Sequence, residues 1–265
     1  MSEKVLVQYE VKDRVAILTL TDPPANTYTH EMMRQLDECI LKARFDENVN
    51  VIVLTGLGEK FFCAGANIDM LSKADPVWKY YFCLHANETL LRLEHTPKLV
   101  IAALNGHCVG GGLEIALAAD IRIARKDAGM IGLPEVALGV LPGTGGTQRF
   151  ARAVGRSLSI ELMATGRKFA YEEALDMGLV NYIYEGNGAS FMEQVMAYAK
   201  QFTIPNKAAM AVGHIKRSVQ TGIEVPLEQG LSLERELQSA LFKSGDAKEG
   251  LMAFVEKRTP KFTGR

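Results

Sequence analysis

The chain has 265 residues, of which 48% are hydrophobic and 23% are charged, so it can bury one large core or a core with an appendage. Its 30 basic and 31 acidic residues give a formal net charge of −1, which offers no overall charge excess for nucleic acid or an anionic membrane surface. The four cysteines form no C-x-x-C pair, which argues against a zinc knuckle or a dithiol redox centre and fits a reducing compartment.

The first ten residues, "MSEKVLVQYE", contain no long apolar run and therefore predict neither a secretory signal nor a transit peptide. No stretch of the chain reaches the roughly 18 apolar residues of a membrane helix. We therefore expect a cytoplasmic protein with neither a membrane nor a nucleic acid as its partner.

Short β-branched runs alternate with helical patterns in the first part of the chain. The segment "VLVQYEVKDRVAILTL" predicts an antiparallel hairpin that turns near Lys12 and Asp13, and a helical pattern follows at 30–44. Further strands are expected at 51–56, 99–106 and 121–124, with helical stretches between them. This alternation predicts an α/β fold whose sheets are mixed and not purely parallel.

The β-rich runs end near residue 186, and the rest of the chain reads as helices broken near Pro205 and Pro226. We therefore divide the chain into residues 1–186, an α/β core, and residues 187–265, a helical region. The last helices are amphipathic, which fits packing either on a second copy of the chain or back on the same core. The apolar positions that show this are Leu227, Leu231, Leu233, Leu237 and Leu241.

Several motifs of other chemistries are incomplete. "HEMMR" at His30 lacks the second histidine of H-E-x-x-H, and "GTGGTQR" at 143–149 lacks the Lys-Ser/Thr of a phosphate loop. Neither glycine cluster spells G-x-G-x-x-G, and no G-x-S-x-G elbow occurs. The five histidines show no ligand spacing, so no metal site is expected.

Two loops with small residues follow predicted strands: "KFFCAGANIDM" at 60–70 and "NGHCVGGGLE" at 105–114. Such loops let backbone N–H groups approach a ligand, and two N–H groups that converge on one point form an oxyanion hole. The alternative is that the glycines only permit tight turns and close helix packing.

Two glutamates stand out beside these loops. Glu114 falls in the first turn of a helix that begins near 110–112, among apolar neighbours that predict burial or a place in a pocket lining. Glu135 follows Pro134 in a loop-like stretch that precedes the next glycine cluster. Two carboxyl groups in one cavity can divide acid and base roles, because environment separates their pKa values. Their spacing in the sequence leaves open whether they meet.

Together these stretches resemble the crotonase (enoyl-CoA hydratase/isomerase) superfamily, and within it enoyl-CoA hydratase most closely. The resemblance implies a spiral of repeated ββα units followed by a C-terminal helical region that forms trimers, commonly stacked as hexamers. Members of this superfamily differ chiefly in the groups around one thioester site, so the resemblance is more specific for the fold than for the reaction. The matching segments are "VAILTLTDPPANTYTHEMM", "FFCAGANIDM", "KLVIAALNGHCVGGGLEIALAADIRIA", "IGLPEVALGVLPGTGGTQR" and "EGLMAFVEKRTPKF".

The resemblance also implies a role for particular residues. The N–H groups of Ala66 and Gly111 would form an oxyanion hole for the thioester oxygen of an acyl-CoA, with Glu114 and Glu135 as the catalytic pair. The N–H of Gly143 would orient Glu135. Coenzyme A is part of the substrate, so no cofactor and no metal is implied. The substrate-binding positions would be Ala64, Ala66, Asn67, Ile68, Asp69, Gly111 and Gly143.

Both catalytic glutamates occur in family hydratases, whereas many isomerases keep only the second. The resemblance therefore implies syn addition of water to a trans-2-enoyl-CoA in fatty-acid or related acyl-CoA degradation, with Glu114 as base and Glu135 as acid. Isomerisation, decarboxylation or thioester hydrolysis on the same scaffold remain alternatives. A non-catalytic RNA-binding assembly is a further alternative, and the near-neutral net charge argues against it. Asn67, where the family often has Asp, and the aromatic segment 76–85 leave the acyl group open.

Overall fold

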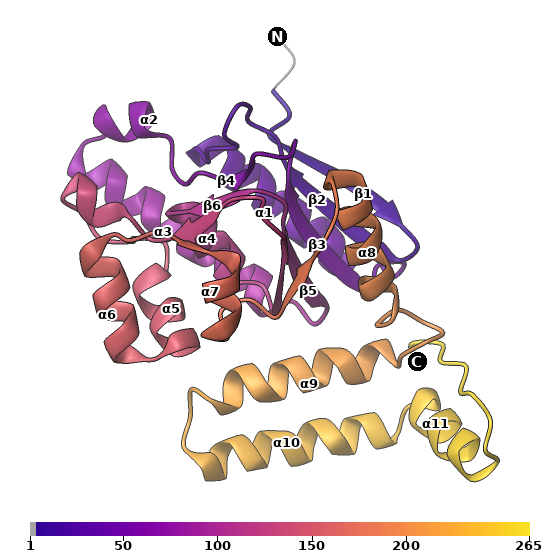
Figure 1. The fold of residues 1–265 in the computed structure, drawn as a ribbon. Coiled ribbons are helices and arrows are strands. Elements are labelled where there is room, and N and C mark those ends of the chain that lie inside the picture. Colours follow the sequence, from indigo (N-terminus) through magenta and orange to yellow (C-terminus); the bar gives the residue numbers. More distant parts are fainter. Residues whose placement is uncertain (1–3) are drawn as a thin grey trace.

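A computed structural model describes residues 4–265, and within them the strands form two sheets (Figure 1). The prediction about an N-terminal targeting signal concerned residues 1–10, and the first three of these lie outside the described part. The larger sheet contains, in spatial order, β1 (Val7–Lys12), β2 (Val15–Leu20), β3 (Val51–Gly56), β5 (Leu99–Leu104), β7 (Ile121–Arg125) and β10 (Tyr182–Tyr184). The smaller sheet contains β4 (Phe61–Cys63), β6 (His107–Val109), β8 (Met130–Gly132) and β9 (Phe169–Ala170).

The predicted hairpin and the mixed sheet are both confirmed. β1 and β2 are antiparallel, and the pair Lys12 and Val15 closes the hairpin. Asp13 and Arg14 have φ angles of 50° and 64°, because a two-residue hairpin turn that matches the strand twist needs positive φ at both positions. The other neighbours in the larger sheet pair in parallel.

The order of the strands shows the repeated ββα units that the resemblance implies. Each of β3, β5 and β7 in the larger sheet leads directly into a short strand of the smaller sheet, β4, β6 or β8, and then into helical structure. β4 pairs in parallel with β6, and β6 with β8. The carboxyl ends of these three short strands therefore lie side by side, and the loops that follow them meet at one edge.

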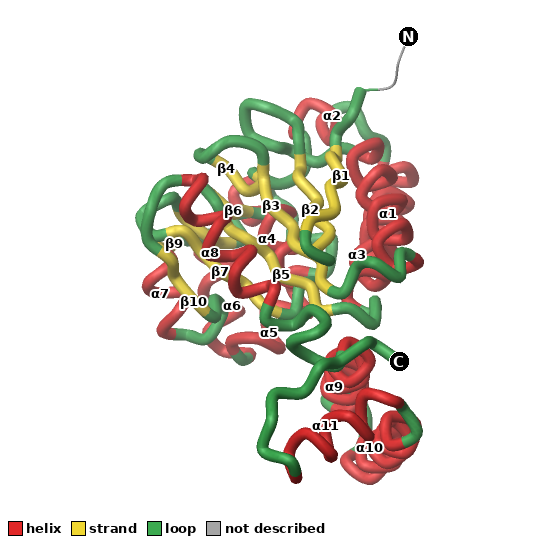
Figure 2. Tube along the Cα trace, turned by 90° about the vertical axis from the view of Figure 1, so that its right-hand side faces the viewer, coloured by secondary structure: helices red, strands yellow, loops and turns green. Residues whose placement is uncertain are grey.

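The helices that follow the first strands cover one face of the larger sheet, and α1 runs beside β1 and β2 in Figure 2. α3 packs against α1. The helical segments up to β10 are α1 (His30–Phe45), α2 (Ile68–Ser72), α3 (Pro76–Glu94), α4 (Gly111–Leu117), the 3₁₀ helix η1 (Glu135–Leu138), α5 (Gly146–Val154), α6 (Arg156–Thr165) and α7 (Tyr171–Asp176).

The opposite face of the larger sheet is covered by α8 (Gly188–Lys200). Alternate residues of the strands point to opposite faces, so Ile52 and Leu54 enter the main core while Val51 and Val53 pack against α8. Both faces are thus buried, which explains why β3 is buried along its whole length and begins with four apolar residues. The first helix after residue 186 is therefore part of the packing around the sheet.

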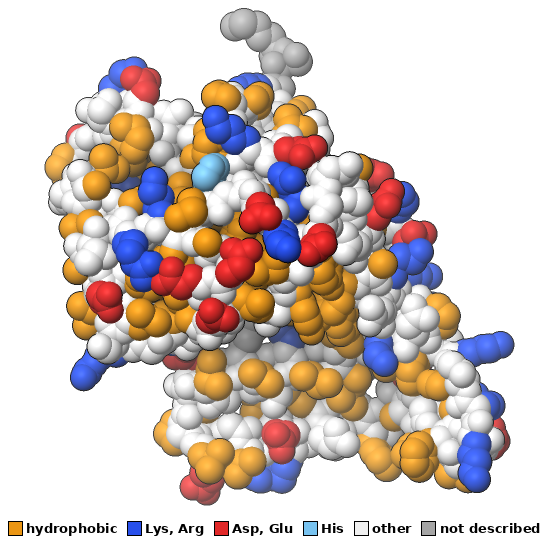
Figure 3. Space-filling model, viewed as in Figure 1, with side chains coloured by type: hydrophobic (Ala, Val, Ile, Leu, Met, Phe, Trp, Pro, Cys, Tyr) orange, Lys and Arg blue, Asp and Glu red, His pale blue; other side chains and the backbone are white. Residues whose placement is uncertain are grey.

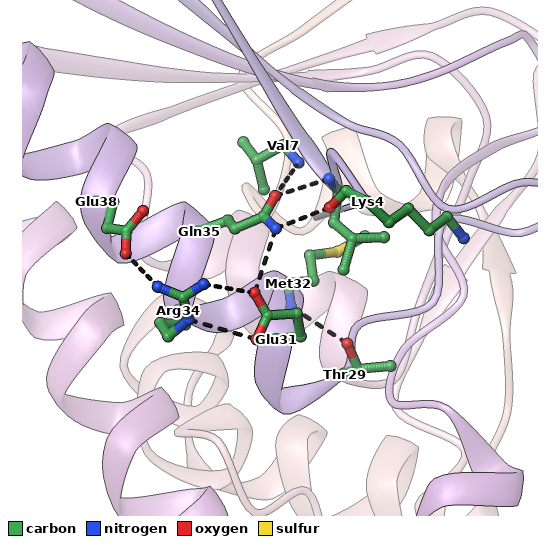
Figure 4. A network of polar contacts seen from close by, with 9 residues as sticks. Lys4, Val7, Thr29, Glu31, Met32, Arg34, Gln35 and Glu38 are labelled. Atoms are coloured by element: carbon green, nitrogen blue, oxygen red, sulfur yellow. Dashed lines mark hydrogen bonds and ion pairs between the residues drawn. The ribbon is translucent and has the colours of Figure 1, made fainter. Parts of the chain in front are cut away.

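A network of side-chain hydrogen bonds fixes the start of α1 against the first strand (Figure 4). Thr29 caps the helix by accepting the N–H of the residue three positions on. Oε1 of Gln35 accepts the N–H groups of Leu6 at 2.7 Å and Val7 at 3.3 Å. Tyr28 directly precedes the cap, so this network also sets where the Tyr28 backbone enters the core.

The last helices, α9 (Ala209–Gly222), α10 (Leu227–Phe242) and α11 (Gly245–Val255), lie beside the sheet layers in Figure 1. Their boundaries agree with the expected breaks near Pro205 and Pro226. A largely buried ion pair joins α9 to the residue that precedes β7, with Lys216 Nζ 2.8 Å from Asp120 Oδ2. Among the helices of residues 4–265, none has the length and apolarity needed to cross a membrane.

Apolar side chains gather along α9–α11 on the face shown in Figure 3. Large apolar residues are commonly exposed one by one, but a contiguous set on one element marks an interaction surface. The exposed large apolar residues of α9–α11 and their connections are Met210, Ile215, Val219, Ile223, Leu227, Leu231, Phe242, Leu251, Met252, Phe254 and Val255.

Candidate active site

The loops that follow β4 and β6 touch each other at glycines. A Cβ built on Gly65 would lie 3.1 Å from the backbone N of Gly111. Gly65 has a φ of +91°, a conformation that favours glycine. A Cβ on Gly111 would overlap the ring of Tyr28, so only glycine fits there. The two predicted loops are thus brought together by close backbone packing.

Two backbone N–H groups at this contact have no protein acceptor within residues 4–265. Ala66 pairs with Tyr28 in a β-bridge whose hydrogen bonds use the Gly65 carbonyl and the Asn67 N–H, which leaves the Ala66 N–H unused. Gly111 is the first residue of α4, where an N–H has no partner inside the helix. The contact therefore offers two free donors on neighbouring loops.

Glu114 lies in the first turn of α4 and is buried, with 2% of its surface exposed, as its apolar neighbours predict. Its Oε1 accepts the N–H groups of Thr144 at 2.7 Å and Gly146 at 2.8 Å. Burial raises the pKa of Glu114, while these two N–H bonds favour the ionised form and oppose the rise. The buried carboxylate thus has charge-assisted partners from the glycine cluster before α5.

Glu135 is the first residue of η1, directly after β8, and so begins a short 3₁₀ helix rather than lying in a loop. Its Oε1 would be 3.1 Å from a Cβ on Gly110, whose carbonyl accepts the N–H of Glu114. Its Oε2 is buried and has no hydrogen-bond partner among the described residues. Burial, and then the negative charge of Glu114, raise the pKa of Glu135 to about 7.

These contacts place the two carboxyl groups and the two free N–H groups around Gly110 and Gly111. The carboxyl groups have different environments: Glu114 accepts two N–H bonds, whereas Glu135 has an oxygen without a partner. Such a difference allows one group to stay ionised while the other carries a proton near neutral pH.

Tyr28 and Thr144 belong to the site although the sequence did not single them out. The Tyr28 ring is buried against Gly111, and its hydroxyl lies 2.9 Å from Oγ1 of Thr144. Tyr28 thus connects the two free N–H groups to the segment whose N–H groups bind Glu114. The glycine cluster around Thr144 was a visible signal, but nothing in the sequence near Tyr28 indicates this contact.

The other expected binding positions lie around the start of α2. The Ala64 N–H donates to the Ala25 carbonyl at 3.0 Å, and Asn67 caps α2 by accepting the Met70 N–H. Ile68 is 55% exposed. Asp69 is also exposed and forms an ion pair with a neighbouring lysine. These side chains are therefore accessible at the rim and do not reach the carboxyl pair.

Gly143 packs against α3, where a Cβ would be 3.2 Å from Sγ of Cys83. Its carbonyl is 3.5 Å from Nδ2 of Asn87. Among residues 4–265 no hydrogen bond joins the Gly143 N–H to Glu135. The N–H groups of Thr144 and Gly146 in the same segment bind Glu114 instead.

Cys63 lies beside the first loop but has the character of a core residue. It is fully buried, and burial raises the pKa of its thiol to about 12. A thiol with so high a pKa is not a nucleophile at neutral pH. Within the described residues, no group of three or more His, Cys, Asp or Glu side chains is placed to hold a metal ion.

The comparisons with known proteins agree over nearly the whole chain. The family model described as enoyl-CoA hydratase/isomerase matches residues 10–265. A probable enoyl-CoA hydratase of Bacillus subtilis is 37% identical, covering 97% of this chain and 98% of the relative. A short-chain-enoyl-CoA hydratase of Clostridium acetobutylicum is 36% identical over 94% of each chain. A crystal structure of an enoyl-CoA hydratase from Geobacillus kaustophilus superposes with a TM-score of 0.95 at 43% identity, covering 100% of this chain and 98% of that one.

Proposed function

The chain belongs to the enoyl-CoA hydratase/isomerase family and is an enzyme of the enoyl-CoA hydratase type, and we propose that it adds water syn across a trans-2-enoyl-CoA at Glu114 and Glu135. One observation supports the assignment of this reaction to these residues. Two carboxyl groups with different environments lie beside two backbone N–H groups that have no acceptor within residues 4–265.

In this proposal the N–H groups of Ala66 and Gly111 hold the thioester oxygen. Their donation draws electrons toward the carbonyl, makes C3 of the acyl group electrophilic and stabilises the enolate that forms. The loss of one such donor costs about 2.7–4 kcal/mol of transition-state stabilisation in a known enzyme. The close packing of Gly65 on Gly111 supports the pairing, because it keeps the two N–H groups on neighbouring loops.

Glu114 acts as the base and Glu135 as the acid. The water oxygen bonds to C3 while one of its protons passes to Glu114, and C2 receives the proton of Glu135. Proton exchange with solvent then restores both groups, so the net reaction adds one water. The two N–H bonds to Glu114 favour its ionised form, and a pKa of about 7 lets Glu135 carry a proton near neutral pH.

The remaining positions frame the substrate in the same proposal. The pantetheine arm of coenzyme A passes the rim of the first loop, the reaction needs no cofactor, and Gly143 borders the acyl group beside α3. The accessible rim around α2 supports this path. The positions assigned to substrate binding are Ala64, Ala66, Asn67, Ile68, Asp69, Gly111 and Gly143.

The helical region 187–265 serves assembly into a homotrimer or a dimer of trimers and helps to cover the site. The exposed apolar residues of α9–α11 support this assignment, since a second copy of the chain would bury them. Such an assembly fits an enzyme of acyl-CoA degradation, including the β-oxidation type.

Incubation with crotonyl-CoA tests the reaction class. We expect the absorbance of the conjugated enoyl thioester to fall and the product to gain the mass of one water, with no free coenzyme A released. Mass spectrometry of the product and a thiol assay check both points. An unchanged mass would indicate isomerisation, and release of coenzyme A would indicate thioester hydrolysis; either result would contradict hydration.

A further inference from the structure

Lys79 lies on the face of α3 that packs against the candidate site. Cys83 and Asn87 follow it at intervals of four residues, and both contact the Gly143 segment. Residues four apart share one face of a helix, so Lys79 continues this face by one turn. Side chains on a helix also lean toward its N-terminus, which carries the Lys79 ammonium beyond the Gly143 segment.

An aromatic stack connects Lys79 to the candidate site. Its Nζ lies 5.0 Å from the centroid of the Phe82 ring. Phe82 stacks on Tyr28 at 5.6 Å and on Trp78 at 5.2 Å. Because Tyr28 packs on Gly111, the stack forms a wall that runs from the free N–H groups to the ammonium.

The ammonium forms no ion pair with either glutamate, but its charge acts on both. Its charge lowers the pKa of Glu114 and of Glu135, against the larger effect of burial. Among residues 4–265 no ion pair or hydrogen bond of the Lys79 ammonium occurs, so its three donors have no anionic partner in the protein. Lys79 is partly buried, and its ammonium beside the aromatic wall is therefore available to an anion from the ligand.

We propose that Lys79 binds a second carboxylate on the acyl group, so that the preferred substrates are 2-enoyl-CoA thioesters of short dicarboxylic acids. This inference rests on the proposed hydratase function of the same site. An acyl carboxylate in this cavity would be repelled by ionised Glu114, and Lys79 offsets that repulsion. The aromatic wall packs against the intervening carbon atoms. Only Phe82 and Tyr28 lie between the ammonium and Gly111 in the stack, so the acyl group extends a few carbons beyond the double bond.

A matched pair of substrates tests this inference: glutaconyl-CoA, and 5-methyl-2-hexenoyl-CoA, in which an isopropyl group replaces the carboxylate. We expect the wild-type protein to prefer glutaconyl-CoA. Lys79→Met lowers kcat/KM for glutaconyl-CoA by about 10- to 100-fold, the range of a hydrogen bond to a charged group. It changes kcat/KM for the apolar analogue by less than about threefold, and Lys79→Arg retains the preference.

Lys42→Met is the control, because Lys42 also lies over an aromatic ring, that of Tyr9, but on α1. It should leave both substrates unaffected. An equal loss of kcat/KM for both substrates in Lys79→Met would overturn the inference, since it would indicate binding of coenzyme A or an effect on the glutamates alone. A wild-type protein without preference for glutaconyl-CoA would overturn it as well.

Binding measurements separate this inference from the proposed reaction. Calorimetry with glutaryl-CoA and 5-methylhexanoyl-CoA, which have no double bond, reports the carboxylate contact without turnover. If hydration of crotonyl-CoA fails but Lys79→Met weakens glutaryl-CoA selectively, the proposed reaction is wrong and the carboxylate site stands. If Lys79→Met weakens neither ester, or both equally, the carboxylate site is wrong.

Discussion

Replacing Glu114 by Gln is expected to lower kcat for crotonyl-CoA hydration by about 10²- to 10⁴-fold, the usual contribution of a general base. The amide oxygen of Gln can still accept the N–H groups of Thr144 and Gly146, so the segment 144–146 keeps its position. What is lost is the basic oxygen that takes the proton of water. Steady-state kinetics on the purified variant measures the effect.

The same substitution changes the ionisation of its neighbour. The negative charge of Glu114 is the second cause of the raised pKa of Glu135, after burial, so the neutral Gln lets that pKa fall below about 7. Glu193→Gln is the matched control, because Glu193 is an exposed glutamate on α8, on the far side of the sheet. Butanoyl-CoA should still raise the thermal unfolding midpoint of Glu114→Gln. Full activity in this variant would remove Glu114 from the mechanism.

Glu135→Gln is expected to lower kcat by a similar 10²- to 10⁴-fold and also to change the pH profile. In the wild-type protein kcat/KM should fall as the pH rises above about 7, because Glu135 must carry a proton to act as the acid. The apparent pKa belongs to the coupled pair of glutamates. The variant should lose this alkaline decline, which a series of kcat/KM measurements from pH 5 to about 9 would show.

Stability gives an independent check on the Glu135 environment. Its pKa rises from 4.5 to about 7 on folding, so the stability that the neutral form contributes is fully present below 4.5 and is lost as the pH rises through about 7. The thermal unfolding midpoint of the wild-type protein should therefore fall across this interval relative to that of Glu135→Gln. A pH profile and unfolding curve that both match the wild type would show that Glu135 does not titrate there.

The longer strands could be predicted from the sequence, but the small sheet could not. β2, β3 and β5 have five or six apolar or β-branched positions in a row, enough to stand out from helical patterns. β4, β6 and β8 have three residues each, too few to show a period. They become strands only because they pair with one another, and that pairing is what brings the loops of the site together.

The candidate site was predictable to different degrees for different residues. The apolar neighbours of Glu114 predicted its burial, because its helix leaves no obvious solvent face. The meeting of Glu114 with Glu135 depends on the parallel pairing of β6 and β8, which the spacing of the two residues does not contain. Tyr28 reaches the site from the segment before α1 and Lys79 from α3, so their contacts arise only from tertiary packing.

A crystal structure with butanoyl-CoA, the saturated analogue of the test substrate, examines the site most directly. We expect the thioester oxygen within hydrogen-bond distance of the N–H groups of both Ala66 and Gly111, with C3 of the acyl chain facing the carboxyl groups of Glu114 and Glu135. A thioester oxygen that bonds elsewhere, or an acyl chain that lies away from both carboxyl groups, would contradict the mechanism.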